Sequence, residues 1–298
     1  MRNALVSLFF KAVKPFMGKG LGKLPLVARL YEFMLQRIVP WGLVKLKTEY
    51  HEMYVDTSRG GIGFATMSQG IYEELVTRVF ENIVSQGMTF VDIGAYIGYH
   101  TLTAARLVGE KGRVFSFEPT PYSYELLIKN IELNGYNNIR ATQKAISNKS
   151  GKAMLFIPEG YNAKSLLLPD KIFNAGEQIE VDTQTLDDFF YDNTGGYTGV
   201  DVIKMDVEGA EPLVIAGMTN IIQSNRQLKI VTELYPKRLI QWGSSAEEYL
   251  NMLLRHGFLI YNLNELTNKM ERVEQNDTLI EHVTLMGSTN LYCVRDSK

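Results

Sequence analysis

FVDIGAYIGYHT, residues 90–101, is the stretch that decides the fold of this chain. An apolar strand runs into Asp92, a turn with Gly94 and Gly98 follows, and a helix begins near Tyr99. Glycine lets the backbone turn tightly and lets a ligand lie close against it. We therefore expect a strand-to-helix turn that binds a ligand, with an ordinary structural turn as the alternative.

The spacing of the glycines and the charge of the turn restrict the ligand. A dinucleotide site needs the pattern G-x-G-x-x-G, with the diphosphate at the helix N-terminus, whereas residues 94–98 read Gly-Ala-Tyr-Ile-Gly. The carboxylate of Asp92 would repel a diphosphate, but it suits a cationic ligand with an ammonium or sulfonium group. The loop therefore favours S-adenosylmethionine over NAD as the cofactor.

Strand and helix patterns alternate through the rest of the chain. Strands are predicted over residues 89–93, 113–117, 139–146, 153–157, 178–183, 200–205, 228–234, 258–263 and 290–294. Helices are predicted over residues 71–85, 99–108, 122–133, 186–191 and 246–256, and from the end of the strand at 200–205 to about residue 223. Such alternation predicts parallel pairing through right-handed crossovers. We expect an α/β fold with a Rossmann-like, doubly wound, mostly parallel sheet of about seven strands, flanked by helices, with ligands at the carboxyl ends of the strands.

The end of the second strand of this series carries another acidic residue. Glu118 stands before Pro119, at the distance from the glycine loop where a carboxylate accepts hydrogen bonds from ribose hydroxyls. Capping of the helix that begins near Tyr122 is the alternative role for Glu118.

A charged cluster follows the strand at 200–205. Residues 203–211 read Ile-Lys-Met-Asp-Val-Glu-Gly-Ala-Glu, so three carboxylates stand close to Lys204 in the sequence. Because like charges repel, three carboxylates so close together are more than a purely structural role requires. Two alternatives stay open: Glu208 and Glu211 complement the dipole of a helix N-terminus, or the carboxylates attract a hard cation such as Mg²⁺. Our preferred interpretation contains no metal ion.

Three motifs together resemble those of the FkbM family of methyltransferases, which has the class I methyltransferase fold. They are residues 92–101, Phe117-Glu118-Pro119 and residues 203–211, of which the last is the most specific, and the similarity covers about residues 70–265. Tyr96 departs from the family pattern, because a small polar residue, often Asn, is usual there. The resemblance implies an S-adenosylmethionine-dependent methyltransferase.

The resemblance also implies roles for individual residues. The predicted cofactor-binding residues are Asp92, Gly94, Ala95, Gly98, Glu118, Ala145, Ile146 and Glu73. The predicted catalytic residues are Asp206, as general base or acceptor-orienting group, and Lys204, which holds the acceptor or keeps Asp206 ionised. The predicted acceptor-binding residues are Glu208, Glu211, Glu233 and His100. Core packing is the alternative for Ala145, Ile146 and His100, and a solvated surface charge is the alternative for Glu73 and Glu233.

Composition and charge restrict the partners and the cellular compartment that we expect for the protein. The 298 residues carry a formal net charge of −2, so the whole molecule has no nucleic-acid footprint. The single cysteine, Cys293, cannot form an intrachain disulfide, and no apolar run is long enough for a transmembrane helix, so we expect a cytoplasmic protein. We expect a basic, partly helical extension over residues 1–45 and a methyltransferase domain over residues 46–298. The extension either packs on this domain or lies peripherally on an anionic membrane.

These patterns predict methyl transfer to a hydroxyl of a sugar, glycan or other polyol natural product, with a small-molecule or glycan acceptor as the partner. Oxygen rather than nitrogen as the acceptor atom is implied by family analogy alone. One alternative is a nucleotide-dependent oxidoreductase on the same fold, against which the missing G-x-G-x-x-G pattern argues. The other is a non-catalytic, membrane-associated partner, against which the intact glycine loop argues.

Overall fold

The computed structural model describes residues 42–59, 72–158, 166–167, 176–196, 199–265 and 267–295. The chain divides into two compact units, with the main boundary between Tyr72 and Glu73. In the first unit, β1 (Leu43–Lys47) and β2 (Glu52–Asp56) pair antiparallel and precede the short 3₁₀ helix η3 (Thr57–Arg59). Residues 43–45, the last of the predicted, partly helical extension, are therefore strand. Residues 1–41, with their predicted membrane contact, lie outside the described residues.

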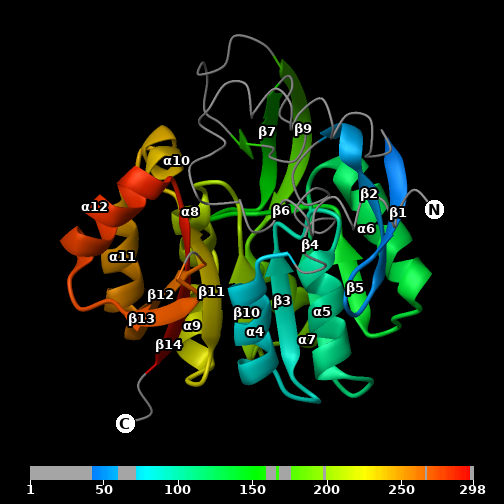
Figure 1. Ribbon diagram of the computed structural model, residues 1–298, viewed down its shortest axis with the longest axis horizontal. Helices are drawn as coiled ribbons and strands as arrows, with labels where there is room; N and C mark the ends of the chain where they lie inside the picture. The colour runs from blue at the N-terminus through cyan, green and yellow to red at the C-terminus, as the bar shows by residue number, and fades with distance from the viewer. Residues whose placement is uncertain are drawn as a thin grey trace. The chain divides into compact units, whose positions relative to one another are not determined.

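The second unit, from Glu73 onward, is built on an eight-stranded mixed sheet (Figure 1). Its strands in spatial order are β13 (Lys269–Arg272), β12 (Phe258–Asn264), β14 (Thr289–Arg295), β11 (Lys229–Leu234), β10 (Val202–Met205), β3 (Thr89–Ile93), β4 (Arg113–Phe117) and β5 (Ile139–Thr142). β14 runs antiparallel to β11 and β12, and β13 runs antiparallel to β12, whereas the other pairs are parallel. All strands except β13 and β14 therefore point the same way, as a doubly wound sheet requires, and the unpredicted β13 extends one edge.

The order of the strands places a switch point beside β3. From β3 the chain moves outward through β4 to β5, and it later returns to β10, which pairs with β3 on its other side. In open α/β sheets, ligands bind outside the carboxyl ends of the strands at such a point. The loops that follow β3 and β10 are therefore the place to look for a site.

Helices cover both faces of this sheet, and each face has its own hydrophobic core. Phe80 of α4 (Glu74–Ile83) and Ala104 of α5 (Tyr99–Val108) belong to one core. The other core contains residues of α7 (Leu186–Thr194), α8 (Glu211–Ala216), α9 (Thr219–Ser224), α10 (Pro236–Gln241), α11 (Ala246–Arg255) and α12 (Asn276–Met286). Side chains alternate along a strand, so Phe90 of β3 joins the first core and Val91 joins the second. The burial of both faces explains why the strands are apolar throughout.

A second, four-stranded sheet corrects one prediction. Residues 139–146, expected as one strand, divide into β5 of the main sheet and β6 (Ala145–Ile146) of the second sheet. The break is a turn in which the N–H of Lys144 donates to the carbonyl oxygen of Thr142 at 3.0 Å. The second sheet has the order β6-β9-β7-β8, with β8 at Leu166–Leu167. β7 (Gly151–Pro158) and β9 (Gly176–Gln184) pair antiparallel, which confirms the predicted strand pair.

Capping side chains mark the starts of two predicted helices. The Oγ of Ser245 accepts a hydrogen bond from the N–H of Glu248 at 3.1 Å where α11 begins. Thr185 does the same for the N–H of Asp188 at 2.9 Å where α7 begins. Both bonds satisfy N–H groups that have no partner within their helix, and both helices agree with those predicted over residues 186–191 and 246–256.

Other helices depart from the predicted pattern. The helix expected to reach residue 223 is interrupted at Gly217, where an added Cβ would lie 2.0 Å from the carbonyl oxygen of Ser147, so that α8 and α9 are separate. The helices α10 and α12 were not predicted; α10 follows Tyr235, with Pro236 at its first position. α6 (Pro121–Asn134) begins in the same way and was predicted. Among the helices of the described residues, none is both long and apolar enough to cross a membrane.

Candidate active site

The loop after β3 packs directly on the ends of β4 and β10. The N–H groups of Gly94 and Ala95 both donate to the carbonyl oxygen of Phe117 at 3.0 Å, and the N–H of Asp206 donates to the carbonyl oxygen of Ile93 at 3.0 Å. Gly94 has a φ of 79°, and an added Cβ would lie 2.0 Å from the carbonyl oxygen of Asp206. Only glycine fits here, because any side chain would separate the two loops.

Glu118 is held at the end of β4 by two backbone groups. One carboxylate oxygen accepts from the N–H of Tyr96 at 3.0 Å, and the other accepts from the N–H of Thr120 at 2.9 Å. Burial raises the pKa of Glu118, against these hydrogen bonds. The side chain of Thr120 also hydrogen-bonds to Glu118. A carboxylate has about four acceptor positions, so Glu118 is oriented beside the glycine loop and retains acceptor capacity.

Tyr96 adopts a backbone conformation that is unfavourable for its residue type. Its φ is 50°, in the left-handed region where Asn is several-fold enriched among non-glycine residues. The strain coincides with the one departure from the FkbM motif that the sequence shows, and it explains physically why Asn is usual at this position.

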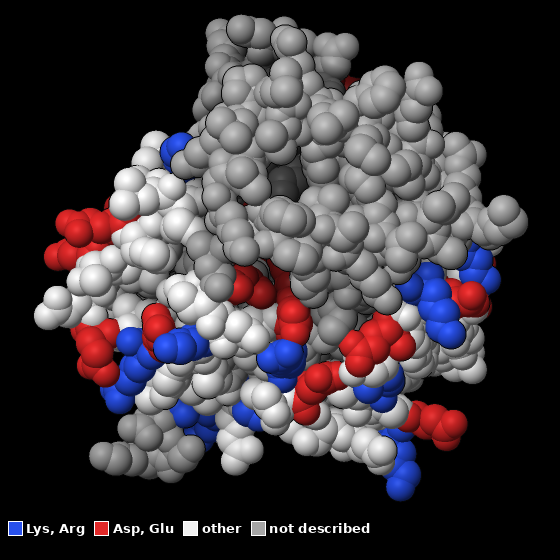
Figure 2. Space-filling model, in the orientation of Figure 1, with Lys and Arg blue, Asp and Glu red and all other residues white. Residues whose placement is uncertain are grey.

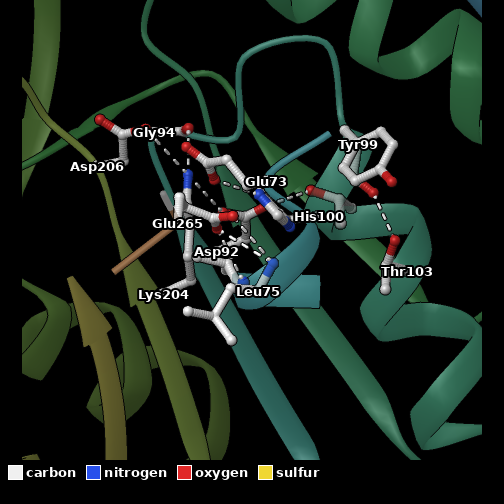
Figure 3. Close-up of polar contacts among 12 residues, drawn as sticks. Glu73, Leu75, Asp92, Gly94, Tyr99, His100, Thr103, Lys204, Asp206 and Glu265 are labelled. Atoms are coloured by element: carbon white, nitrogen blue, oxygen red, sulfur yellow. Dashed lines mark hydrogen bonds and ion pairs between the residues drawn. The ribbon is translucent and has the colours of Figure 1, made fainter. Parts of the chain in front are cut away.

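Lys204 lies among carboxylates at the ends of β10 and β3. Its Nζ is 3.7 Å from Oδ1 of Asp92 and 3.6 Å from Oδ2 of Asp206, and it donates to the carbonyl oxygen of Gly94 at 3.4 Å (Figure 3). Burial opposes the charged form, but Asp206, Asp92 and other nearby carboxylates raise the pKa of Lys204 above its ordinary value. Lys204 is therefore a fixed cation that pairs with both aspartates.

Asp92 and Asp206 differ in their access to solvent. Asp92 is fully buried, and its second oxygen accepts from the hydroxyl of Thr101 at 2.6 Å. The side chain of Asp206 is 28% exposed, whereas the side chain of Lys204 is 8% exposed. Of these three side chains, that of Asp206 is the most exposed.

Glu73 and His100 form a pair on the same side of the site. Nε2 of His100 lies 2.8 Å from a carboxylate oxygen of Glu73 (Figure 3). Burial raises the pKa of Glu73, but the hydrogen bond and charge of His100, together with Lys204, leave this pKa below its usual range. His100 is buried edge-on against the ring of Phe80, with 5.4 Å between the ring centroids. The predicted packing role of His100 therefore includes holding Glu73.

Three carboxylates meet at the ends of β10 and β11. Oxygen atoms of Asp206, Glu208 and Glu233 lie within 4.8 Å of one another, a spacing compatible with a shared cation. Glu208 already has a cationic neighbour, since Nε of Arg238 lies 3.6 Å from its Oε2. Gly209 makes this approach possible, because an added Cβ there would lie 2.6 Å from the carbonyl carbon of Arg238.

Glu211 faces inward and holds the turn after β10. It is 1% exposed, and one of its oxygens accepts from the N–H groups of Val207 and Gly209 at 3.1 and 3.3 Å. Burial raises the pKa of Glu211 to about 7, against these backbone hydrogen bonds. The acceptor contact expected of Glu211 stays a prediction, but the geometry favours a structural role because its side chain is occupied and enclosed.

The predicted site residues other than Glu211 fall into two groups. The carboxyl edge of the main sheet brings together Asp92, Gly94, Ala95, Gly98, Glu118, Glu73, His100, Lys204, Asp206, Glu208 and Glu233. Ala145 and Ile146 lie in β6 of the second sheet and are buried, so their contact with adenine stays a prediction. The sequence interpretation missed Thr101 and Arg238. Thr101 stands within the quoted motif, whereas no sequence pattern indicates that Arg238 meets Glu208.

The balance of charged side chains at the site fits S-adenosylmethionine better than a diphosphate. Asp92, Asp206, Glu208, Glu233 and Glu73 outnumber the two cations that pair with them, Lys204 and Arg238. Elsewhere the charges are mixed: acidic and basic side chains are interspersed over the described residues on the face shown in Figure 2. An excess of carboxylates suits a sulfonium and an ammonium group, and it opposes phosphate.

A comparison with protein families agrees with this chemistry. Residues 92–260, more than half of the chain, match the methyltransferase FkbM domain. This match extends from the aspartate of the glycine loop to β12, so it contains the ends of β3, β4, β10 and β11 that form the site.

Several characterised proteins are similar to the chain. Methyltransferase sdnD of Sordaria araneosa is 27% identical over 51% of this chain and 69% of its own length. Methyltransferase 1 of Beauveria bassiana is 26% identical over 43% of this chain and 57% of its own length. The hexuronic acid methyltransferase AglP of Haloferax volcanii is 28% identical over 51% of this chain and 59% of its own length. The matches thus span only part of each relative.

Solved structures of methyltransferases are also similar to the chain. A SAM-dependent methyltransferase from Aquifex aeolicus has a TM-score of 0.38 at 16% identity, over 75% of this chain and 89% of the other. TYW2 of M. jannaschii, in complex with AdoMet, has a TM-score of 0.44 at 13% identity, over 86% of this chain and 88% of the other.

Proposed function

Because the chain belongs to the methyltransferase FkbM family and uses S-adenosylmethionine as its methyl donor, we propose that its acceptor is a hydroxyl group of a sugar, glycan or other polyol. The family decides against the alternative of a nucleotide-dependent oxidoreductase. A relative named as a hexuronic acid methyltransferase supports a sugar as the acceptor. The carboxylates at the ends of β10 and β11 support it further, because carboxylates accept hydrogen bonds from hydroxyl groups.

The cofactor lies, in this proposal, along the ends of β3 and β4. Its methionine part lies along the backbone of Gly94, Ala95 and Gly98, and Glu118, which is oriented by two backbone N–H groups, accepts hydrogen bonds from the ribose hydroxyls. Asp92 is buried and paired with Lys204, so it acts on the cofactor through its charge and through the shape of the loop. When bound, S-adenosylmethionine supplies an electrophilic methyl group next to the acceptor.

Asp206 is the proposed general base or orienting group for the acceptor hydroxyl. Its side chain is 28% exposed, whereas that of Glu208 is 8% exposed and already faces Arg238. Lys204 stays protonated and places a fixed positive charge 3.6 Å from Oδ2 of Asp206. A carboxylate that holds the hydroxyl in line with the methyl group provides both proximity and a place for the proton. The exposure of Asp206 at the switch point is the observation that carries this assignment.

The acceptor class is tested by methyl transfer from labelled S-adenosylmethionine to a panel of compounds. The panel pairs each alcohol with the matching amine, for example methyl glucoside with methyl 6-amino-6-deoxyglucoside, and includes uronates and open-chain polyols. Label in the alcohols that is removed by demethylating ether cleavage supports the proposal. Label in the amines alone overturns it.

A further inference from the structure

Two cavities adjoin each other between β12 and α12, near the edge of the main sheet that ends in β13 (Figure 1). The first, of about 200 Å³, lies where β12 ends and β14 begins. The second, of about 410 Å³, lies between β12, β13 and α12. Asn262, Asn264 and His282 line both cavities. The two cavities therefore form one continuous groove, which we call the α12 groove.

The α12 groove begins at the proposed place of methyl transfer. Glu233 and Glu73 line its first cavity. An oxygen atom of Glu233 lies within 4.8 Å of one of Asp206. Glu73 accepts a hydrogen bond from the side chain of Asn290, and both glutamates act on Lys204, so their charges belong to the ion network of the site. A molecule with a hydroxyl at Asp206 can therefore extend past Glu233 into the groove.

Uncharged polar side chains line both cavities of the groove. These amide and hydroxyl groups belong to Asn262, Asn264, Gln275, Thr278, Thr289 and Asn290. Among the described residues that line the second cavity, the apolar ones are Val273 and Leu279. A lipid or polyketide chain would cover the polar groups without replacing their hydrogen bonds to water, which costs free energy, whereas the hydroxyls of a sugar replace these bonds.

Charged side chains of the second cavity are of both signs. Nε of Arg272 lies 3.4 Å from Oε1 of Glu274, and both side chains are more than half exposed. Exposed pairs of this kind are screened by water and contribute little to binding. The second cavity therefore suits an uncharged molecule that is rich in hydroxyl groups.

The volumes indicate the size of the molecule that the groove holds. The first cavity, at about 200 Å³, lies below the range of about 300–1,000 Å³ that is typical of small-molecule sites, so by itself it holds one ring or a similar fragment. The second cavity has about twice this volume. A single sugar ring at Asp206 would leave the second cavity to water.

We infer that the α12 groove binds an oligosaccharide acceptor, with the methylated ring in the first cavity and at least one further ring in the second. The inference rests on the proposed function, since it deepens the identity of the same acceptor. It selects a glycan of two or more rings over a single sugar or an open-chain polyol.

The dependence of binding on the number of rings tests the inference. The full chain is saturated with S-adenosylhomocysteine and titrated with the methyl glycoside of the sugar that the acceptor panel shows to be methylated best. It is also titrated with disaccharides that extend this ring at each of its other oxygen atoms. We expect the best disaccharide to bind at least about tenfold more tightly than the single ring, because it gains contacts in the second cavity.

Equal binding of the single ring and of every disaccharide overturns the inference but leaves the proposed function intact. A panel in which no sugar is methylated overturns both. The two failures are therefore distinguishable.

A pair of variants locates the gain in the second cavity. Thr278 is exposed on α12 and lines the second cavity but not the first, so Thr278→Trp fills that cavity. We expect this variant to lose the gain from the second ring and to bind the single ring as the unaltered protein does. Thr284→Trp is the matched control, because Thr284 is exposed on the same helix and lines neither cavity. A gain that persists in Thr278→Trp, or that Thr284→Trp removes equally, contradicts the inference.

Discussion

Lys204 of β10 lies directly opposite Asp92 of β3 in the parallel register, and its Nζ is 3.7 Å from Oδ1 of that carboxylate. Both side chains are buried, and each belongs to the second-last residue of its strand, just before a loop of the site. The pair thus joins the glycine loop to the loop that carries Asp206, and removal of either charge leaves the other buried without its partner.

Substitution of Lys204 by Met is expected to destabilise the protein strongly. The variant leaves Asp92 buried without its cation, and breaking a buried pair in this way costs about 3–5 kcal/mol. Asp92→Asn keeps the shape and the contact with Thr101. The double variant should therefore be more stable than the sum of the two single effects predicts. Urea unfolding of all four proteins measures this coupling, and strict additivity would show that the two charges do not interact.

Asp206→Asn is expected to spare cofactor binding and to lower turnover. Asp206 lies on the acceptor side of the site, and a lost general base lowers the rate by about 10²–10⁴-fold. Calorimetric titration with S-adenosylhomocysteine and the rate of methyl transfer to the best acceptor give the two quantities. Asp192→Asn, at an exposed position of α7, is the control. If Asp206→Asn abolishes cofactor binding, Asp206 belongs to the cofactor site instead.

Glu211 is expected to make the protein less stable as the pH rises from about 4.5 to about 7. Its pKa is about 7 in the folded chain and about 4.5 in the unfolded chain, so the folded state binds more protons in this interval. The shift corresponds to a loss of about 3 kcal/mol that is complete above pH 7. Glu211→Gln should remove this loss and raise the Tm at pH 8 more than at pH 5.

The control for Glu211 is Glu132→Gln, at an exposed position of α6. Thermal unfolding of the three proteins between pH 4.5 and pH 8 supplies the comparison. An unchanged pH dependence in Glu211→Gln would mean that the Glu211 carboxyl has the same pKa in the folded and unfolded chains.

Tyr96→Asn is expected to stabilise the protein. Tyr96 has a φ of 50°, and the left-handed conformation costs most residues about 1–2 kcal/mol, less for Asn. The N–H that donates to Glu118 is kept in any variant other than proline. We expect a rise in Tm of about 2 °C by calorimetry. Tyr96→Phe keeps the strain and should not raise the Tm; an equal rise in both variants would rule out relief of backbone strain as the cause.

Methyl transfer is expected to proceed in EDTA. The carboxylates of Asp206, Glu208 and Glu233 come close enough to share a cation, but Lys204 and Arg238 already lie 3.6 Å from two of them. These fixed cations reduce the gain in free energy from a divalent ion. The rate of transfer is measured with excess EDTA, with and without added Mg²⁺. Activity that EDTA abolishes and Mg²⁺ restores would establish the metal-dependent alternative.

Local patterns account for the parts of the structure that the sequence predicted well. The bounds of β3, α5 and β4 agree with the predicted ones, because the sequence pattern of each of these short elements ends clearly. The strand predicted over residues 139–146 was wrong, since its two halves belong to different sheets. No local pattern specifies that division, because both halves have similar residues and only their pairing partners differ.

By itself, the sequence determined the doubly wound fold, the family and the glycine loop, because these follow from residues close together in the chain. It also placed Asp206 and Glu118 at strand ends, where parallel strands bring ligand-binding groups to one edge. Only the tertiary structure decided that Lys204 pairs with Asp92 and that Arg238 faces Glu208. The physical reason is that strand register and loop packing join residues far apart in sequence, and the balance of their charges exists only once they meet.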